Sequence, residues 1–216
     1  MKKEERMSEN EEIKNEVVQE NPTPKKKKFD KNSVLWCVMI LVIIGVVAGA
    51  LLGGINVVTY VDPDEAILTI INNNYSGAAD ITKDSSYVVN GYANGTCVSA
   101  FTYKVNDAKM VCYYVIGKGA YDGEIEILFF VTEAGIVDGV QVYANGETSS
   151  VGGKVLKGID KIKGFDLTTL TEYGSATNSE AQSMNYYVSG ATVTTKGVTN
   201  ALKVCAAAYN NREVQA

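Results

Sequence analysis

The sequence predicts an α+β protein, with one N-terminal transmembrane helix followed by a single domain in which helices flank a mostly antiparallel sheet. Three observations carry this prediction. Residues 34–52 hold no charged side chain, short runs between residues 97 and 143 have strand-like composition, and residues 198–209 carry one apolar stripe at helical spacing. Separate helical and strand-forming segments of this kind are typical of α+β domains.

Residues 1–33 form a polar, charged tail that contains a run of lysines, Lys25–Lys28. The apolar stretch that follows, residues 34–58, is long enough to cross the ~30 Å hydrocarbon core of a bilayer as a helix. Because positive charge before a span favours the cytoplasmic side, we expect the tail in the cytoplasm and residues 60–216 outside the cell membrane. The apolar run is too long and begins too late for a cleaved signal peptide, which favours a retained anchor.

Three glycines, Gly45, Gly49 and Gly53, recur on one face of the expected span. Small residues at this spacing let two helix backbones approach closely, so they predict packing against a membrane partner or a second copy. The ordinary enrichment of glycine in membrane helices is the alternative explanation.

The exported part opens with Asp62 and Pro63, which suit the N-cap and the first position of a helix ending in residues 72–74. Strand-like runs follow, and a polar turn at residues 106–109 joins the first two. Their spacing predicts an antiparallel meander. The four expected strands are residues 97–105, 110–116, 125–131 and 136–143.

The cysteines of the first hairpin are not expected to form a disulfide. With a turn at residues 106–109, Cys112 lies opposite about Tyr103, and Cys97 lies roughly 20 Å further along, at ~3.3 Å per residue. A disulfide requires Cα atoms closer than ~7 Å. We therefore expect buried thiols at Cys97 and Cys112.

The remaining chain predicts a loop, an irregular stretch and a helix. Residues 146–153 are small and polar, and residues 154–180 hold at most a short helix near Leu156–Ile162. The apolar stripe of the last helix follows Thr194 and Thr195, either of which is a suitable N-cap.

Composition narrows the possible functions. The chain has no histidine, so it lacks the most common general base and metal ligand. Residues 60–216 hold eleven basic and seventeen acidic side chains, whereas nucleic-acid binders usually have a basic surface. We therefore predict no metal site, no nucleic-acid partner and no catalytic side chain, with the chemistry supplied by a cofactor.

Residues 189–195, Ser-Gly-Ala-Thr-Val-Thr-Thr, lie immediately before the last helix. Free N–H groups and the positive end of the helix dipole make a helix start an anion site. Gly190 and Ala191 leave room for a ligand, and Thr192 places a hydroxyl beside the site. A small-residue turn capped by a threonine is the alternative. The hydroxyls that can help to hold a phosphate belong to Ser189, Thr194 and Thr195.

This segment resembles the flavinylation motif of FMN-binding domains. Such domains occur in the G subunit of the Rnf ion-translocating electron-transport complex and in the C subunit of the sodium-pumping NADH:quinone oxidoreductase. The resemblance implies that a flavin transferase attaches FMN to Thr192 through a phosphoester bond, which makes the chain a covalent flavoprotein. The chain length favours the Rnf G subunit.

The resemblance extends to three further segments, of which the first is Gly54–Thr59 at the end of the expected span. Gly117–Gly119 matches a glycine-rich strand connection, and residues 147–152, Glu-Thr-Ser-Ser-Val-Gly, match a Glu-Thr-Pro-Gly-Leu-Gly loop that lies against the flavin in the family. Two departures affect flavinylation efficiency and loop conformation: Tyr186 stands in place of a usual aspartate, and Ser149-Ser150 in place of Pro-Gly. The contacts that this loop implies come from Glu147, Thr148, Val151 and Gly152.

The resemblance implies an electron-carrier subunit of a membrane-bound ferredoxin:NAD oxidoreductase that translocates Na+ or H+. Its partners would be the other membrane subunits, and it would not catalyse the net reaction alone. One alternative is an extracytoplasmic flavoprotein of another electron-transfer system, and another is a non-redox anchored module that has lost the flavin. Weaker site candidates are Lys154 for the phosphate and Tyr121, Tyr143, Tyr186 and Tyr187 for stacking on the ring.

Overall fold

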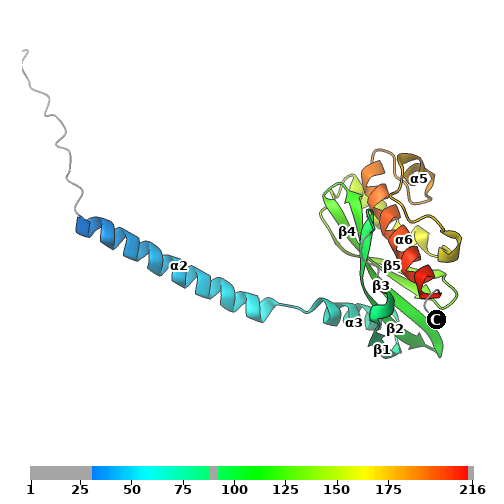
Figure 1. The fold of residues 1–216 in the computed structure, drawn as a ribbon, viewed down its shortest axis with the longest axis horizontal. Coiled ribbons are helices and arrows are strands. Elements are labelled where there is room, and N and C mark those ends of the chain that lie inside the picture. Colours follow the sequence, from blue (N-terminus) through cyan, green and yellow to red (C-terminus); the bar gives the residue numbers. More distant parts are fainter. Residues whose placement is uncertain (1–30, 88–91, 214–216) are drawn as a thin grey trace, which may run out of the picture. The chain divides into compact units, whose positions relative to one another are not determined.

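The computed structural model describes residues 31–87 and 92–213, and the chain divides into two units, residues 1–60 and 61–216. The described part of the first unit is helix α2, Lys31–Thr59 (Figure 1). Its most apolar stretch has a mean hydropathy of 2.9, and the helix is long and apolar enough to cross a membrane. The prediction for residues 34–58 therefore agrees with a helix, whereas the tail prediction falls almost entirely outside the described residues.

The glycine face of α2 is open in the single chain. A Cβ atom added at Gly45, Gly49 or Gly53 would meet nothing within 4 Å. The expected packing of this face against another helix stays a prediction.

The second unit is built on a five-stranded antiparallel sheet in the order β1-β2-β3-β4-β5. The meander predicted from the spacing of the strand-like runs is confirmed, and so is the α+β class. The strands are β1 (Ala79–Lys83), β2 (Gly95–Val105), β3 (Ala108–Ala120), β4 (Gly123–Thr132) and β5 (Val137–Asn145).

The register of the first hairpin differs from the expected one. Asn106 and Asp107 both have positive φ, 50° and 64°, which is the backbone of a two-residue type I′ turn. The tighter turn places Phe101, rather than Tyr103, opposite Cys112. Cys97 and Cys112 belong to the cores on opposite faces of the sheet, and both thiols are buried and form no disulfide, as predicted.

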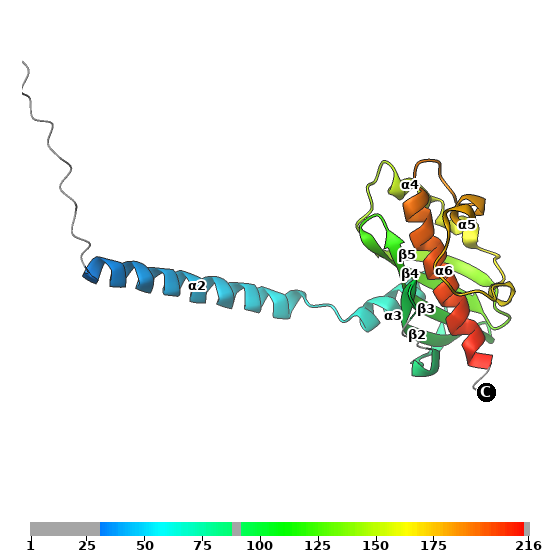
Figure 2. The ribbon, with the colours of Figure 1, turned by 45° about the horizontal axis from the view of Figure 1, so that its top comes forward.

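A helix covers each face of the sheet. Helix α3, Pro63–Asn74, has the predicted N-cap, since Asp62 accepts a hydrogen bond from the Asp64 amide at 2.9 Å. It buries Ile67 and Ile71 against one face. The other face is covered by α6, Thr192–Glu213, which lies across the strands in Figure 2.

The chain between β5 and α6 is more ordered than its composition indicates. It contains α4 (Gly152–Lys157), the 3-10 helices η2 (Ile159–Ile162) and η3 (Leu167–Thr169), and α5 (Asn178–Ser183). The single helix expected near Leu156–Ile162 is thus two short helices. Helix α5 was not predicted, although Thr177 and Glu180 form a capping box at its start.

The contact between α6 and β3 is unusually close and fixes the start of α6. A Cβ on Gly197 would lie 2.7 Å from the Cβ of Ala120, and a Cβ on Gly117 would lie 2.7 Å from the Cβ of Ala201. The buried side chain of Asn200 locks this crossing, because its amide nitrogen donates to the carbonyl oxygen of Lys118 at 2.6 Å.

Candidate functional site

A pocket of about 400 Å³ lies where three segments of the second unit meet, at the start of α6. The segments are the turn after β3, the loop after β5 and the chain entering α6. Its size falls within the ~300–1,000 Å³ typical of small-molecule sites. The lining residues are Tyr121, Glu147, Thr148, Val151, Gly152, Gly190, Ala191, Val193 and Thr194.

Glu147 connects all three segments. One carboxylate oxygen accepts a hydrogen bond from the Tyr121 amide at 2.8 Å, and the other accepts from the Thr194 hydroxyl at 2.7 Å. Gly152 packs against this second bond, because a Cβ there would overlap Glu147 and lie 2.6 Å from the Thr194 hydroxyl oxygen. The loop therefore needs glycine at position 152 for steric reasons, and Glu147 serves as a local hydrogen-bonding anchor.

The start of α6 has the properties of an anion site. Gly190 has φ of +84° and turns the chain into the helix. The first amide of the helix to donate to a backbone carbonyl is that of Thr195, whose partner is Ala191 at 3.0 Å. Within the described residues, the amides of Thr192, Val193 and Thr194 have no backbone acceptor. Such amides and the helix dipole together favour a negatively charged group.

Thr192 is the first residue of this helix and lies beside the pocket rather than in its lining. Its side chain is half-buried, and its hydroxyl is 3.5 Å from that of Tyr187. Ser189 is exposed at the preceding turn. Ser189 is thus accessible to solvent and Thr192 partly so, and Thr192 lies in the chain between two pocket residues, Ala191 and Val193.

Two of the expected phosphate donors are differently engaged. Thr194 lines the pocket, but it gives its one hydroxyl proton to Glu147. Thr195 is fully buried and donates to the carbonyl oxygen of Ala191 at 3.0 Å. The expected N-cap at either residue is wrong, because the helix begins at Thr192. Neither side chain offers a free hydroxyl proton to a ligand in this structure.

Tyr186, which stands where the family motif has aspartate, lies in the core. Its side chain is 2% exposed, and its hydroxyl is 3.0 Å from that of Thr199 on α6. Burial raises its pKa to about 12. An ionised carboxylate would be costly at this position, so the departure from the motif matches the apolar surroundings that this chain builds there.

The weaker candidates for contacts with a cofactor differ in whether they line the pocket. Tyr121 is 74% exposed and lines the pocket. Tyr143 instead packs on Tyr114, at 5.2 Å between ring centroids, and belongs to the core covered by α3. Lys154 is exposed on α4. Val193 was missed by sequence reasoning, since one apolar residue between two threonines gives no signal of a pocket wall.

Comparison with known families agrees with this location. Residues 120–207 match the family model described as FMN-binding domain. A search of curated proteins finds no match. The matched region contains every lining residue of the pocket, from Tyr121 to Thr194. It supports an FMN-binding domain, and thereby a flavin-based electron carrier.

Proposed function

We propose that this chain carries FMN esterified to Thr192 and relays electrons as the G subunit of an Rnf-type complex. The single observation that carries the proposal is the juxtaposition of a half-buried threonine, a helix start whose first amides have no backbone acceptor among the described residues, and a pocket. The motif at residues 189–192 and the family match over residues 120–207 support it independently.

The residues of the site fit both ends of FMN. Among the described residues, the backbone amides of Val193 and Thr194 donate to no backbone carbonyl. They are therefore available to a phosphate on Thr192. The apolar side chains of Val151, Ala191 and Val193 line the adjacent pocket, which suits a flat aromatic ring. When bound, FMN supplies one- and two-electron redox chemistry.

Each segment of the site would have a defined task in holding the cofactor. The start of α6 binds the phosphate, and the loop at residues 147–152 covers one side of the pocket. Glu147 holds this loop in register with α6 through its bond to Thr194. Covalent attachment at Thr192 would prevent loss of a flavin from a pocket that opens to solvent outside the cell.

Attachment at Thr192 is tested on a denaturing gel. The full-length chain is produced with and without an active flavin transferase, and flavin fluorescence of its band is recorded. We expect fluorescence only with the transferase, its loss in Thr192→Ala and its retention in Ser189→Ala. The Ser189 variant is the matched control, because it removes an exposed hydroxyl three residues away. A fluorescent Thr192→Ala band, or a dark wild-type band, would refute the covalent assignment.

Membership of an Rnf-type complex, and the outward position of the domain, need separate experiments. A tagged chain purified from its native membranes in mild detergent should bring down other membrane redox subunits, and Thr192→Ala should abolish ferredoxin:NAD activity of those membranes. A cysteine introduced at the exposed Tyr121 should react with a membrane-impermeant reagent from the outside of intact cells. Purification of the chain with an unrelated reductase would favour another electron-transfer system.

A further inference from the structure

The charge of the second unit is unevenly distributed. Residues 60–216 hold seventeen acidic and eleven basic side chains, yet four of those eleven fall between residues 154 and 163, where Asp160 is the only acidic residue. The remaining surface is therefore more acidic than the average suggests. The four basic residues, hereafter the lysine patch, are Lys154, Lys157, Lys161 and Lys163.

Along the chain, the lysine patch begins two residues after the pocket residue Gly152. Helix α4 begins at Gly152, a pocket residue, and carries Lys154 and Lys157, while η2 and the residue after it carry the other two. All four side chains are exposed, and none makes an ion pair within the described part of the chain. Their charges are therefore not neutralised within the described residues.

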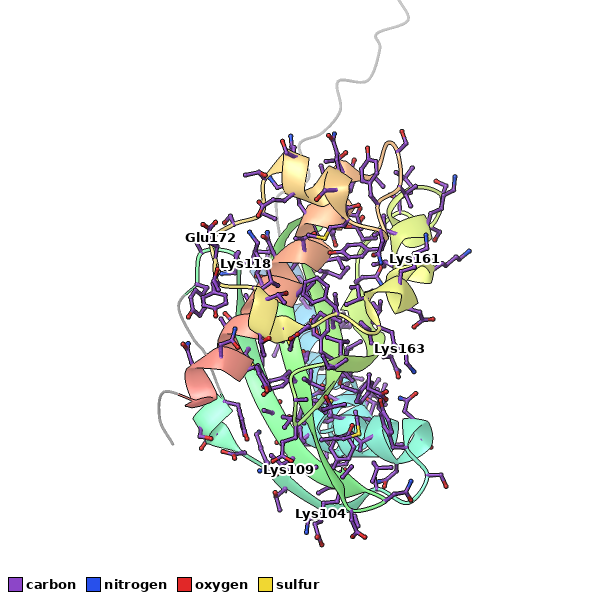
Figure 3. The ribbon with its side chains drawn as sticks, turned by 90° about the vertical axis from the view of Figure 1, so that its right-hand side faces the viewer. Lys104, Lys109, Lys118, Lys161, Lys163 and Glu172 are labelled. Atoms are coloured by element: carbon purple, nitrogen blue, oxygen red, sulfur yellow. The ribbon has the colours of Figure 1, made fainter. Side chains whose placement is uncertain are left out.

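The segment that bears the lysine patch is held firmly by the core. Val155, Ile159 and Ile162 are buried beneath it, and Asn185 donates a hydrogen bond to the carbonyl oxygen of Lys161 at 2.9 Å. Figure 3 shows Lys161 and Lys163 on one side of the unit. Fixed charges in one place favour a specific electrostatic contact over a diffuse one.

The mouth of the pocket adds apolar contact area beside these charges. Tyr121, Val151 and Val193 line the pocket and are 74%, 44% and 47% exposed. Across β1–β5 and the following helices, the only other large apolar side chain with comparable exposure among the described residues is Val98. An apolar centre next to charged residues is the usual anatomy of a protein–protein interface.

We propose that the lysine patch and the apolar mouth of the pocket dock an acidic redox protein, which exchanges electrons with the flavin. This inference rests on the proposed function. Outside residues 154–163, the segment 60–216 holds sixteen acidic and seven basic side chains, so its net charge repels such a partner and the patch orients it towards the pocket. A basic partner would instead be drawn to the rest of the surface and held away from the pocket.

Electron transfer is tested with two probe proteins of opposite charge. Full-length protein in detergent, with its flavin reduced by dithionite, is mixed with excess acidic plastocyanin or basic cytochrome c, and flavin reoxidation is followed by stopped flow. One electron passes from the flavin to each oxidised metal centre, and the protons of the reduced flavin pass to water, so two acceptors are consumed per fully reduced flavin. We expect the plastocyanin rate to fall as salt increases, because electrostatic steering is screened.

Charge reversal locates the attraction. Lys161→Glu/Lys163→Glu should slow plastocyanin by about 10-fold at low salt, within the 10–10³ range of electrostatic steering, and should not slow cytochrome c. The matched control Lys104→Glu/Lys109→Glu reverses two charges at the far end of the sheet (Figure 3) and should change both rates less than about twofold. Equal effects of the two double variants, or a plastocyanin rate independent of salt, would overturn the proposal.

A second measurement needs no flavin and separates failure of docking from failure of the proposed function. A carbodiimide joins lysine amines to carboxylates in contact with them, and mass spectrometry identifies the lysines joined to plastocyanin. Cross-links concentrated in the lysine patch support docking even if the gel shows no flavin. Cross-links spread equally over Lys104 and Lys109 refute it. The same lysines can also be labelled with an amine reagent in the presence of phosphatidylglycerol bilayers or of plastocyanin. If only the bilayers protect the patch from labelling and no cross-links to plastocyanin form, the patch contacts lipid and the proposal is refuted.

Discussion

The hydrogen bonds of Glu147 give a quantitative test of how the pocket is assembled. Glu147→Ala removes the acceptors of the Tyr121 amide and the Thr194 hydroxyl together. A hydrogen bond to a charged group contributes about 1.5–3 kcal/mol. The two bonds together would contribute about 3–6 kcal/mol if they were shielded from solvent. Because Glu147 is only half-buried and water can replace it in part, we expect a smaller loss, about 2–3 kcal/mol.

Glu147→Gln is the matched variant, since it keeps the shape and both contacts. The amide oxygen can accept from the Tyr121 backbone, and the amide nitrogen can donate to the Thr194 hydroxyl, which also serves as an acceptor. Only the charge is lost. We therefore expect glutamine to cost less than about 1 kcal/mol.

Thermal unfolding of the full chain in detergent, followed by the near-ultraviolet signal of the domain tyrosines, measures both effects. In a domain of this size 1 kcal/mol corresponds to about 2–4 °C, so alanine should lower Tm by roughly 5–10 °C and glutamine by less than about 4 °C. In a Thr194→Val background, the cost of Glu147→Ala should shrink, because the two changes remove the same bond. An equal loss for alanine and glutamine would refute the reasoning.

Three further predictions concern the framework around the pocket. Gly197→Ala, which in an isolated helix would stabilise by ~1 kcal/mol, should here destabilise by about 1–3 kcal/mol through its clash with Ala120; a raised midpoint in urea would contradict this. Tyr186→Asp should cost at least about 2 kcal/mol by burying a carboxyl group, whereas Tyr186→Phe should retain full flavin incorporation on the gel. Bonding to Lys203 holds the pKa of Glu180 below its usual value, so its stabilisation exists above about pH 4.3 and is lost as pH falls through the lower folded-state pKa. The stability difference between wild type and Glu180→Gln should therefore be present at pH 7 and shrink towards pH 3.

The sequence predicts the fold well where periodicity is strong. Four strands alternate or carry β-branched and aromatic residues, and the structure contains all four. Strand β1 was missed because it is a short edge strand with no fully buried side chain, so its five residues carry no apolar pattern. The hairpin register was shifted because the predicted turn was longer than the two residues, Asn106 and Asp107, that close it.

The site was less accessible to sequence reasoning. The resemblance at residues 189–192 indicates where a flavin would be attached, and the loop at residues 147–152 lines the same pocket as Gly190 and Ala191. Nothing in the pattern predicts that Glu147 bonds Thr194, since that contact depends on how two segments 47 residues apart are brought together. The start of α6 was placed too late because threonine side chains are good N-caps, whereas here two of them bond other partners.

The close crossing of β3 and α6 explains why the pocket forms where it does. Ala120, the last residue of β3, touches the position of Gly197, and the next residue in the chain, Tyr121, lines the pocket. On the helix side Thr194, which also lines the pocket, lies less than one turn before Gly197. A larger residue at the crossing would push β3 and α6 apart and so increase the distance between Tyr121 and Thr194. Glu147 could then no longer accept hydrogen bonds from both residues. The two glycines of the crossing, Gly117 and Gly197, do not line the pocket, yet they set its width.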